Sequence, residues 1–148
     1  MAEISAIVLA GGKSSRMGKD KAQVRVHRHG MLEDAVIKLS GDFPEIIVAS
    51  NDIYSFPGID VVADIYPGRG PMGGIHAGLE ASGSHTNFVV ACDMPFINVD
   101  LALYLVSLAA GYDAVVPRLG VYFQPLFAVY TKNCLPAIRH AGKPVLTS

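Results

Sequence analysis

The sequence has few of the residues that mark several large classes of protein. It contains only two cysteines, Cys92 and Cys134, too few for a disulfide-stapled scaffold and not spaced as a metal knuckle. Charged residues make up 17% of the 148 residues, and acidic and basic side chains nearly balance at a net charge of −1. A chain with this charge balance lacks the excess of basic residues that proteins use to bind nucleic acid or an anionic membrane.

Long hydrophobic runs are also missing, although apolar residues make up 51% of the chain. The run Ile4–Ala10 follows Glu3 and lacks a basic segment before it, which is not the pattern of a signal peptide. The run Leu101–Ala110 is about half as long as a bilayer span requires. Because the apolar content excludes intrinsic disorder, we expect residues 1–148 to form one globular, reduced, cytoplasmic domain.

Two kinds of hydrophobic segment alternate along the chain. Short, continuous, β-branched runs predict strands that are buried on both faces, and helical periodicity predicts helices between them. One apolar stripe recurs at Leu32, Val36 and Leu39, and Asp100 is expected to cap a later helix. The predicted strands are Ile4–Leu9, Glu45–Ala49, Ile59–Ala63, Asn87–Ala91, Ala114–Pro117 and Phe123–Tyr130, and the predicted helices are Met31–Leu39, Gly73–Ala81, Asp100–Ala110 and Lys132–His140.

This alternation predicts an α/β fold, a three-layer α/β/α sandwich around a Rossmann-like, mostly parallel sheet. In such a fold, ligands bind where loops leave the carboxyl ends of the strands. Eight of the fifteen glycines are gathered at two such places, within Gly11–Gly18 and Gly68–Gly78. Glycines there let the backbone approach a ligand closely or adopt positive φ angles.

The first glycine-rich loop has the composition of a triphosphate cradle. It reads Leu-Ala-Gly-Gly-Lys-Ser-Ser-Arg-Met-Gly-Lys-Asp-Lys from position 9 to 21. Backbone N–H groups in such a loop form an anion-binding nest, and Arg16 and Lys21 can pair with phosphate oxygens. It is not a P-loop, because that motif requires a glycine where Ile7 stands. A surface turn with solvated cations is the alternative.

The second glycine-rich loop matches G-x-G-x-x-G at Gly68, Gly70 and Gly73, with Asp93 twenty residues further on. A dinucleotide fingerprint should sit at a tight strand-to-helix turn. Here three residues separate the glycines from Asp64 at the end of the predicted strand. A loop entering a helix is therefore favoured over a dinucleotide site.

The third stretch is an apolar strand that ends in Cys92 and Asp93. An aspartate at that position is either a turn former or a ligand for Mg²⁺, which favours one or two carboxylates together with substrate phosphates. Cys92 is expected to be buried rather than reactive. The histidines show no zinc spacing, and the segment Arg25–His29 is interpreted as a solvated basic edge.

These stretches together resemble the molybdenum cofactor guanylyltransferase family. The family signature L-A-G-G-x-x-x-R-M-G-x-D-K is filled by residues 9–21, and its P-G-x-G-P-[LM]-G-G-I loop by residues 67–75. Its C-D-x-P segment is present at 92–95, and its [HQ]-P-L-x-A-V-Y strand at 124–130. The resemblance spans nearly the whole chain.

The resemblance implies a Mg²⁺-dependent nucleotidyltransferase that moves GMP from GTP to molybdopterin and releases pyrophosphate. It also implies roles for individual residues: backbone contacts to the nucleotide in the first loop, phosphate neutralisation by the cations of that loop, and metal binding by the aspartate at the end of the third stretch. The implied nucleotide-binding residues are Leu9, Ala10, Gly11, Gly12, Lys21, Asn51, Asp64 and Asp93, the catalytic residues Arg16, Lys21 and Asp93, and the metal ligand Asp93. The implied partners are GTP, molybdopterin, other cofactor-biosynthesis proteins and molybdoenzymes.

Two departures from the family pattern leave alternatives open. Arg28-His29-Gly30 stands where the family has G-K-P. The family segment that follows Gly142-Lys143-Pro144 and carries N-x-N-T-P is not in this sequence, which is either a fragment or a chain that lacks the segment. A related nucleotidyltransferase that uses CTP or another acceptor is one alternative. A shortened protein that binds GTP without catalysis is a second, and a dinucleotide-dependent oxidoreductase is a third.

Overall fold

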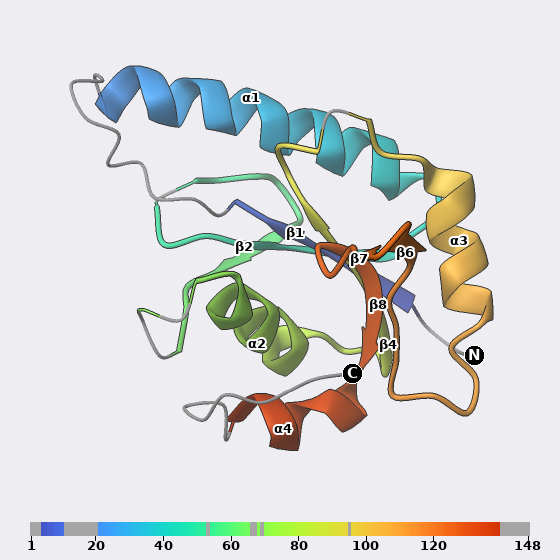
Figure 1. Cartoon of the computed structure of the whole chain (residues 1–148). Helices are drawn as coiled ribbons and strands as arrows, with labels where there is room; N and C mark the ends of the chain where they lie inside the picture. Colours follow the sequence, from blue (N-terminus) through green and yellow to red (C-terminus); the bar gives the residue numbers. More distant parts are fainter. Residues whose placement is uncertain are drawn as a thin grey trace.

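The computed structural model describes residues 4–10, 21–52, 54–65, 68, 70–94 and 96–139, with only the backbone of 21–25 described. Strands and helices follow one another from β1 to α3, with β2 and β3 consecutive, and four strands then precede the last helical segment (Figure 1). The elements are β1 (Ile4–Leu9), α1 (Lys21–Ser40), β2 (Glu45–Ala49), β3 (Asp60–Val62), α2 (Pro71–Ala81), β4 (Thr86–Ala91), α3 (Val99–Ser107), β5 (Ala114–Val115), β6 (Arg118–Leu119), β7 (Tyr122–Phe123), β8 (Phe127–Thr131), a short 3-10 helix (Lys132–Cys134) and α4 (Leu135–Arg139).

Six of the described strands form one sheet in the order β3-β2-β1-β4-β8-β5. β1 pairs in parallel with β2 and β4, and β3 pairs in parallel with β2. β8 is antiparallel to both β4 and β5. The sheet is therefore mostly parallel, as predicted. Its order reverses between β1 and β4, which is the switch point where open α/β sheets bind their ligands.

Helices cover both faces of the sheet and complete three layers (Figure 1). Side chains of α1 and α3 pack on one face, against residues such as Val8 and Phe88. Side chains of α2 and α4 pack on the other face, against residues such as Ile7 and Val89. Consecutive residues of a strand point to opposite faces, so the continuous apolar runs fill both cores. The predicted three-layer sandwich is confirmed.

Helix α2 lies close to the sheet because two of its glycines face β1. A Cβ on Gly78 would lie 2.6 Å from Cγ2 of Ile7, and one on Gly74 would lie 2.9 Å from Cδ2 of Leu9. Any side chain at these positions would push the helix away from the central strand. The glycines that the sequence concentrates before and within α2 therefore serve packing as well as turns.

The predicted strand Phe123–Tyr130 is wrong, because the structure divides it between β7 and β8. The intervening residues form a turn in which Phe127 N–H donates to the Gln124 carbonyl at 3.2 Å, and Gln124 N–H donates to the Pro117 carbonyl at 2.9 Å. Pro125 has no N–H for a strand ladder. The apolar residues around it nevertheless gave the segment the composition of a single strand.

The helix boundaries also differ from the predicted ones. α1 begins ten residues before the predicted start at Met31, α3 ends at Ser107, and the last segment combines a 3-10 turn with α4. Asp100 does not cap α3. The cap is Asn98, whose side chain accepts a hydrogen bond from the N–H of Leu101 at 3.0 Å, and Asp100 lies within the first turn. Within the described residues, no helix combines the length and the apolar character needed to cross a membrane.

An ion pair joins α4 to α2. Arg139 donates from Nε and from Nη2 to Oε2 of Glu80, at 2.9 and 2.7 Å. This hydrogen bonding is the main cause that lowers the pKa of Glu80 from 4.5. Because the folded pKa is the lower one, the pair stabilises the fold above the unfolded value and loses that contribution as pH falls through the folded value.

Arg139→Leu is therefore expected to lower the free energy of unfolding at pH 7 by less than about 1 kcal/mol, since both side chains are partly exposed. In acid below the folded pKa of Glu80, the variant and the wild type should have the same urea midpoint. Urea titrations at the two pH values measure the difference. An equal difference at both would show that the loss comes from something other than this charge pair.

Candidate functional site

The carboxyl ends of four parallel strands bring the predicted site residues to one edge of the sheet. Asp64 follows β3, Asn51 follows β2, the first glycine-rich loop follows β1, and Asp93 follows β4. Neighbouring strands lie about 4.8 Å apart, so three steps place Asp64 and Asp93 about 14 Å apart across the loop. The two carboxylates thus lie on either side of the end of β1 and do not form one cluster.

Asn51 and Asp64 contact each other on the β2–β3 side of this edge. The Asn51 carbonyl oxygen accepts a hydrogen bond from the backbone N–H of Asp64 at 2.9 Å, and its Nδ2 donates to Oδ2 of Asp64 at 3.3 Å. One amide side chain therefore fixes both the backbone and the carboxylate of Asp64. The prediction named both residues but not this contact.

The first loop is described only at its two ends. The Leu9 carbonyl accepts from the Cys92 N–H, and the Ala10 N–H donates to the Ala49 carbonyl, both at 2.9 Å. These bonds anchor the start of the loop to the strands on either side. Gly11, Gly12 and Arg16 lie outside the described residues. Lys21 begins α1, and its side chain also lies outside them.

Asp93 is exposed in the turn after β4, beside a buried Cys92. Burial is the main cause that raises the pKa of the Cys92 thiol to about 11, and the nearby Asp93 carboxylate adds to the shift. The thiol lies 3.7 Å from the Ala10 carbonyl oxygen, which it approaches as a weak donor. The expectation that Cys92 is buried is confirmed, and the raised pKa of its thiol favours the protonated form near neutral pH.

A pocket of about 200 Å³ opens next to Asp93, between α1 and the segment that joins β4 to α3. Its lining residues are Met31, Asp34, Ala35, Lys38, Cys92, Asp93, Met94 and Ile97. The pocket gives the Asp93 carboxylate access to a ligand at the switch point of the sheet.

The chemistry of Asp93 fits a magnesium ion that is shared with a substrate. Mg²⁺ is bound in many phosphate-transfer sites by one or two carboxylates, with substrate phosphates and water as the other ligands. Among the residues that the structure describes, no group of three or more His, Cys, Asp or Glu side chains could hold a metal ion. A single exposed carboxylate beside the first glycine-rich loop, which is predicted to bind phosphate, suits this shared type of site.

Arg28 is the residue at this edge that sequence reasoning missed. It was interpreted as part of a solvated basic edge, but its side chain is only 15% exposed and lies 3.8 Å from the Asp52 carboxylate. It is also close enough to Cys92 to act on the thiol pKa. The signal was the helical period, because Arg28 lies four residues before Leu32 and so extends the buried stripe of α1.

His29 also departs from the predicted solvated edge. Its ring is stacked on Phe56, with the ring centroids 4.9 Å apart and the planes 8° apart, and it lies 5.8 Å from the Tyr54 ring. The segment before the apolar stripe of α1 is therefore packed against the connection between β2 and β3.

The second glycine-rich loop enters α2, as the loop interpretation predicted. Gly68 and Gly70 have φ angles of 91° and 61°, and Gly70 is the N-cap of the helix. In a dinucleotide fold, the glycine loop and the acidic residue follow adjacent strands. Here β2 and β1 lie between β3 and β4, so Asp93 is not at the ribose position and the dinucleotide interpretation is excluded.

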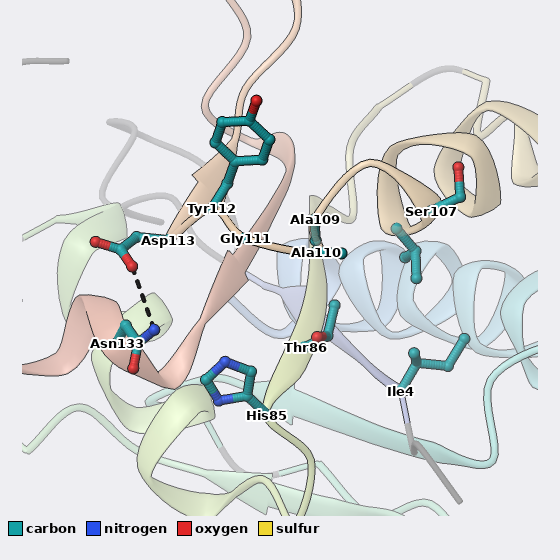
Figure 2. A pocket seen from close by; sticks show the side chains of 11 residues that line it. Ile4, His85, Thr86, Ser107, Ala109, Ala110, Gly111, Tyr112, Asp113 and Asn133 are labelled. Atoms are coloured by element: carbon teal, nitrogen blue, oxygen red, sulfur yellow. Dashed lines mark hydrogen bonds between the residues drawn. The ribbon is translucent and has the colours of Figure 1, made fainter.

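A cavity larger than the pocket at Asp93 lies at the opposite edge of the sheet. It measures about 440 Å³ and is lined by residues at the amino ends of β1 and β4, including Ile4, His85 and Thr86. Figure 2 shows Asn133 directed at Asp113, to which its amide donates at 3.2 Å. Because the loops of the predicted site leave the other edge, the smaller pocket at Asp93 is the candidate site.

Comparison with known proteins identifies the family. The MobA-like NTP transferase domain matches residues 6–144. The chain belongs to this family. A protein of Pelotomaculum thermopropionicum named "Probable molybdenum cofactor guanylyltransferase" is 42% identical, over 95% of this chain and 70% of its own. The "Molybdenum cofactor guanylyltransferase" of Syntrophotalea carbinolica is 38% identical, over 90% of this chain and 66% of its own.

Solved structures with a similar fold include a cytidylyltransferase. The 2-C-methyl-D-erythritol 4-phosphate cytidylyltransferase of Thermus thermophilus superposes with a TM-score of 0.64 at 18% identity, covering 98% of this chain and 80% of that one. This likeness shows the fold. The resemblance to the molybdenum cofactor guanylyltransferase family, predicted from the motifs, is confirmed by the family match and by the sequence relatives.

Proposed function

We propose that this protein transfers GMP from GTP to the molybdenum cofactor, giving the guanine dinucleotide form of the cofactor and pyrophosphate. The observation that carries the proposal is the 42% identity with a named relative over 95% of the chain. The placement of Asp64 and Asp93 on either side of the first loop supports it. We propose that the reaction takes place in the cytoplasm.

The charges at the site indicate which part of the nucleotide binds near Asp64 and which part binds near Asp93. The Asp64 carboxylate only accepts hydrogen bonds, and it would repel phosphate oxygens. It therefore takes an N–H of the base or a hydroxyl of the ribose, together with Asn51. We place the phosphates near Asp93 instead, where a bound Mg²⁺ would offset the repulsion between this carboxylate and the phosphate oxygens. Arg16 and Lys21, whose side chains lie outside the described residues, are proposed to neutralise the phosphate charge.

The reaction is a phosphoryl-type transfer that depends on positioning and charge. An oxygen of the terminal phosphate of molybdopterin attacks the α-phosphorus of GTP, and the bond from this phosphorus to the pyrophosphate oxygen breaks. Pyrophosphate leaves with the electron pair. Loop amides and the two cations stabilise the charge that develops on the phosphate oxygens. Asp93 would hold Mg²⁺, which supplies further neutralisation of the triphosphate when bound.

Lys21→Ala is expected to weaken GTP binding about tenfold or more, because a charge-assisted contact to phosphate is lost. Binding of guanosine, which has no phosphate, should not change. Calorimetric titrations with the two ligands separate the effects. Equal losses for GTP and guanosine would contradict the phosphate role of this lysine.

The proposal is tested by incubating the protein with molybdenum cofactor, Mg²⁺ and GTP labelled at the α-phosphate. We expect the label to enter the cofactor with one equivalent of pyrophosphate released, and only when the cofactor is present. CTP and ATP, labelled at the same position, serve as control donors that test the preference for guanine. Preference for CTP would contradict the guanine assignment, and tight GTP binding without transfer would favour a non-catalytic GTP-binding protein.

A further inference from the structure

Gly73, the third residue of α2, lies directly against the carboxylate of Asp64. A Cβ added to Gly73 would lie 2.7 Å from Oδ2 and 2.8 Å from Cγ of Asp64, much closer than the contact distance of non-bonded heavy atoms. The end of the Asp64 side chain thus occupies the space that any side chain at position 73 would need. The carboxylate can rest on the first turn of α2 only because position 73 is a glycine.

Asn51 holds the same carboxylate by a hydrogen bond. Its Nδ2 donates to Oδ2 of Asp64 at 3.3 Å, and its side-chain oxygen accepts from the backbone N–H of Asp64 at 2.9 Å. The first turn of a helix carries partial positive charge, which favours a carboxylate there. Asp64 is therefore seated between an amide that follows β2 and the beginning of α2.

We propose that Gly73 is a positioning residue, which fixes the orientation in which Asp64 meets the nucleotide. The inference rests on the proposed function, in which Asp64 accepts a hydrogen bond from the base or the ribose. A side chain at position 73 would turn the carboxylate away from its seat and from the nucleotide donor. The fold would keep its stability, because the displaced atoms are the end of a partly exposed side chain and alanine is the better helix former.

The other buried glycines of α2 provide a contrast. A Cβ on Gly78 would meet Ile7, whose side chain is fully buried between the helix and β1. Nothing at that position can move without disturbing the core. Gly73 therefore faces a polar group of the site, whereas Gly78 faces the hydrophobic core, and substitutions at the two positions should have opposite consequences.

The test compares Gly73→Ala, Asp64→Ala, the double variant and Gly78→Ala by GTP titration and by thermal melting without nucleotide. Gly73→Ala and Asp64→Ala should each weaken GTP binding about tenfold, the expected loss of one hydrogen bond to a charged group. The double variant should bind within about twofold of Asp64→Ala alone, because both changes remove one contact. Gly73→Ala should keep the melting temperature, whereas Gly78→Ala should lower it and keep GTP affinity.

Full GTP affinity in Gly73→Ala would overturn the proposal, and so would a further tenfold loss when this change is added to Asp64→Ala. Unchanged GTP binding by Asp64→Ala would contradict the positioning role of Gly73. It would leave the proposed function intact, because the wild type would still bind GTP. Failure of the wild type to bind GTP would instead contradict the proposed function itself.

Discussion

Asp93→Ala is expected to reduce the rate of guanylyl transfer by at least two to three orders of magnitude, the loss typical of removing one charge-stabilising group from an active site. The carboxylate is exposed after the end of β4, and it lines the pocket between α1 and the segment that joins β4 to α3. Its removal takes away the proposed ligand for Mg²⁺ but leaves the hydrophobic cores unchanged. The melting temperature without nucleotide should therefore stay within the range of ordinary surface substitutions.

The matched control for this variant is Asp42→Asn, an exposed aspartate in the connection between α1 and β2, at the amino edge of the sheet. It should keep both the rate and the melting temperature. Transfer rates measured over a range of Mg²⁺ concentrations separate metal binding from catalysis. A large fall in the melting temperature of Asp93→Ala, with the rate preserved, would make Asp93 a structural turn former instead.

Phe88→Ala is expected to lower the free energy of unfolding by about 3–5 kcal/mol. Phe88 is fully buried in β4, and its ring lies 4.9 Å from that of Phe127 and 5.8 Å from that of Phe43. The cavity left by the ring lies between α1, α3 and the sheet, where side chains from several elements meet. A loss of this size is a large fraction of the stability of an ordinary domain.

Equilibrium unfolding in urea measures this change, with Phe96→Ala as the control. The Phe96 side chain is 71% exposed, so its removal should change the free energy of unfolding by less than about 0.5 kcal/mol. Equal effects of the two substitutions would show that the core does not depend on the aromatic cluster around Phe88.

The central strands were predictable because their hydrophobic signal is local. Ile4–Leu9 and Glu45–Ala49 agree with the structure at both ends, since continuous apolar runs bounded by polar residues favour buried parallel strands. The first half of α1 was not predicted, because its buried stripe contains Arg28 instead of an apolar residue. The break between β7 and β8 was missed for the opposite reason, as apolar residues continue on both sides of it.

The candidate site could be predicted in part, from the rule that loops after parallel strands share one edge. The rule predicts that Asn51, Asp64 and Asp93 lie at the same edge of the sheet, although it does not predict their contacts. The hydrogen bonds between Asn51 and Asp64 depend on how β2 and β3 pair, which no single segment encodes. The contact between the Asp64 carboxylate and Gly73 depends in turn on where α2 begins. Contacts between elements far apart in the sequence therefore had to come from the structure.

The most direct test of the site is a calorimetric titration of the protein with GTP in the presence and absence of Mg²⁺, with CTP and ATP as controls. We expect tight binding of GTP that depends on the metal ion and exceeds the binding of both other nucleotides. Asp93→Ala should lose the dependence on Mg²⁺. Equal binding of GTP and CTP, or no binding by a well-folded sample, would contradict the assignment of this edge of the sheet as a guanine nucleotide site.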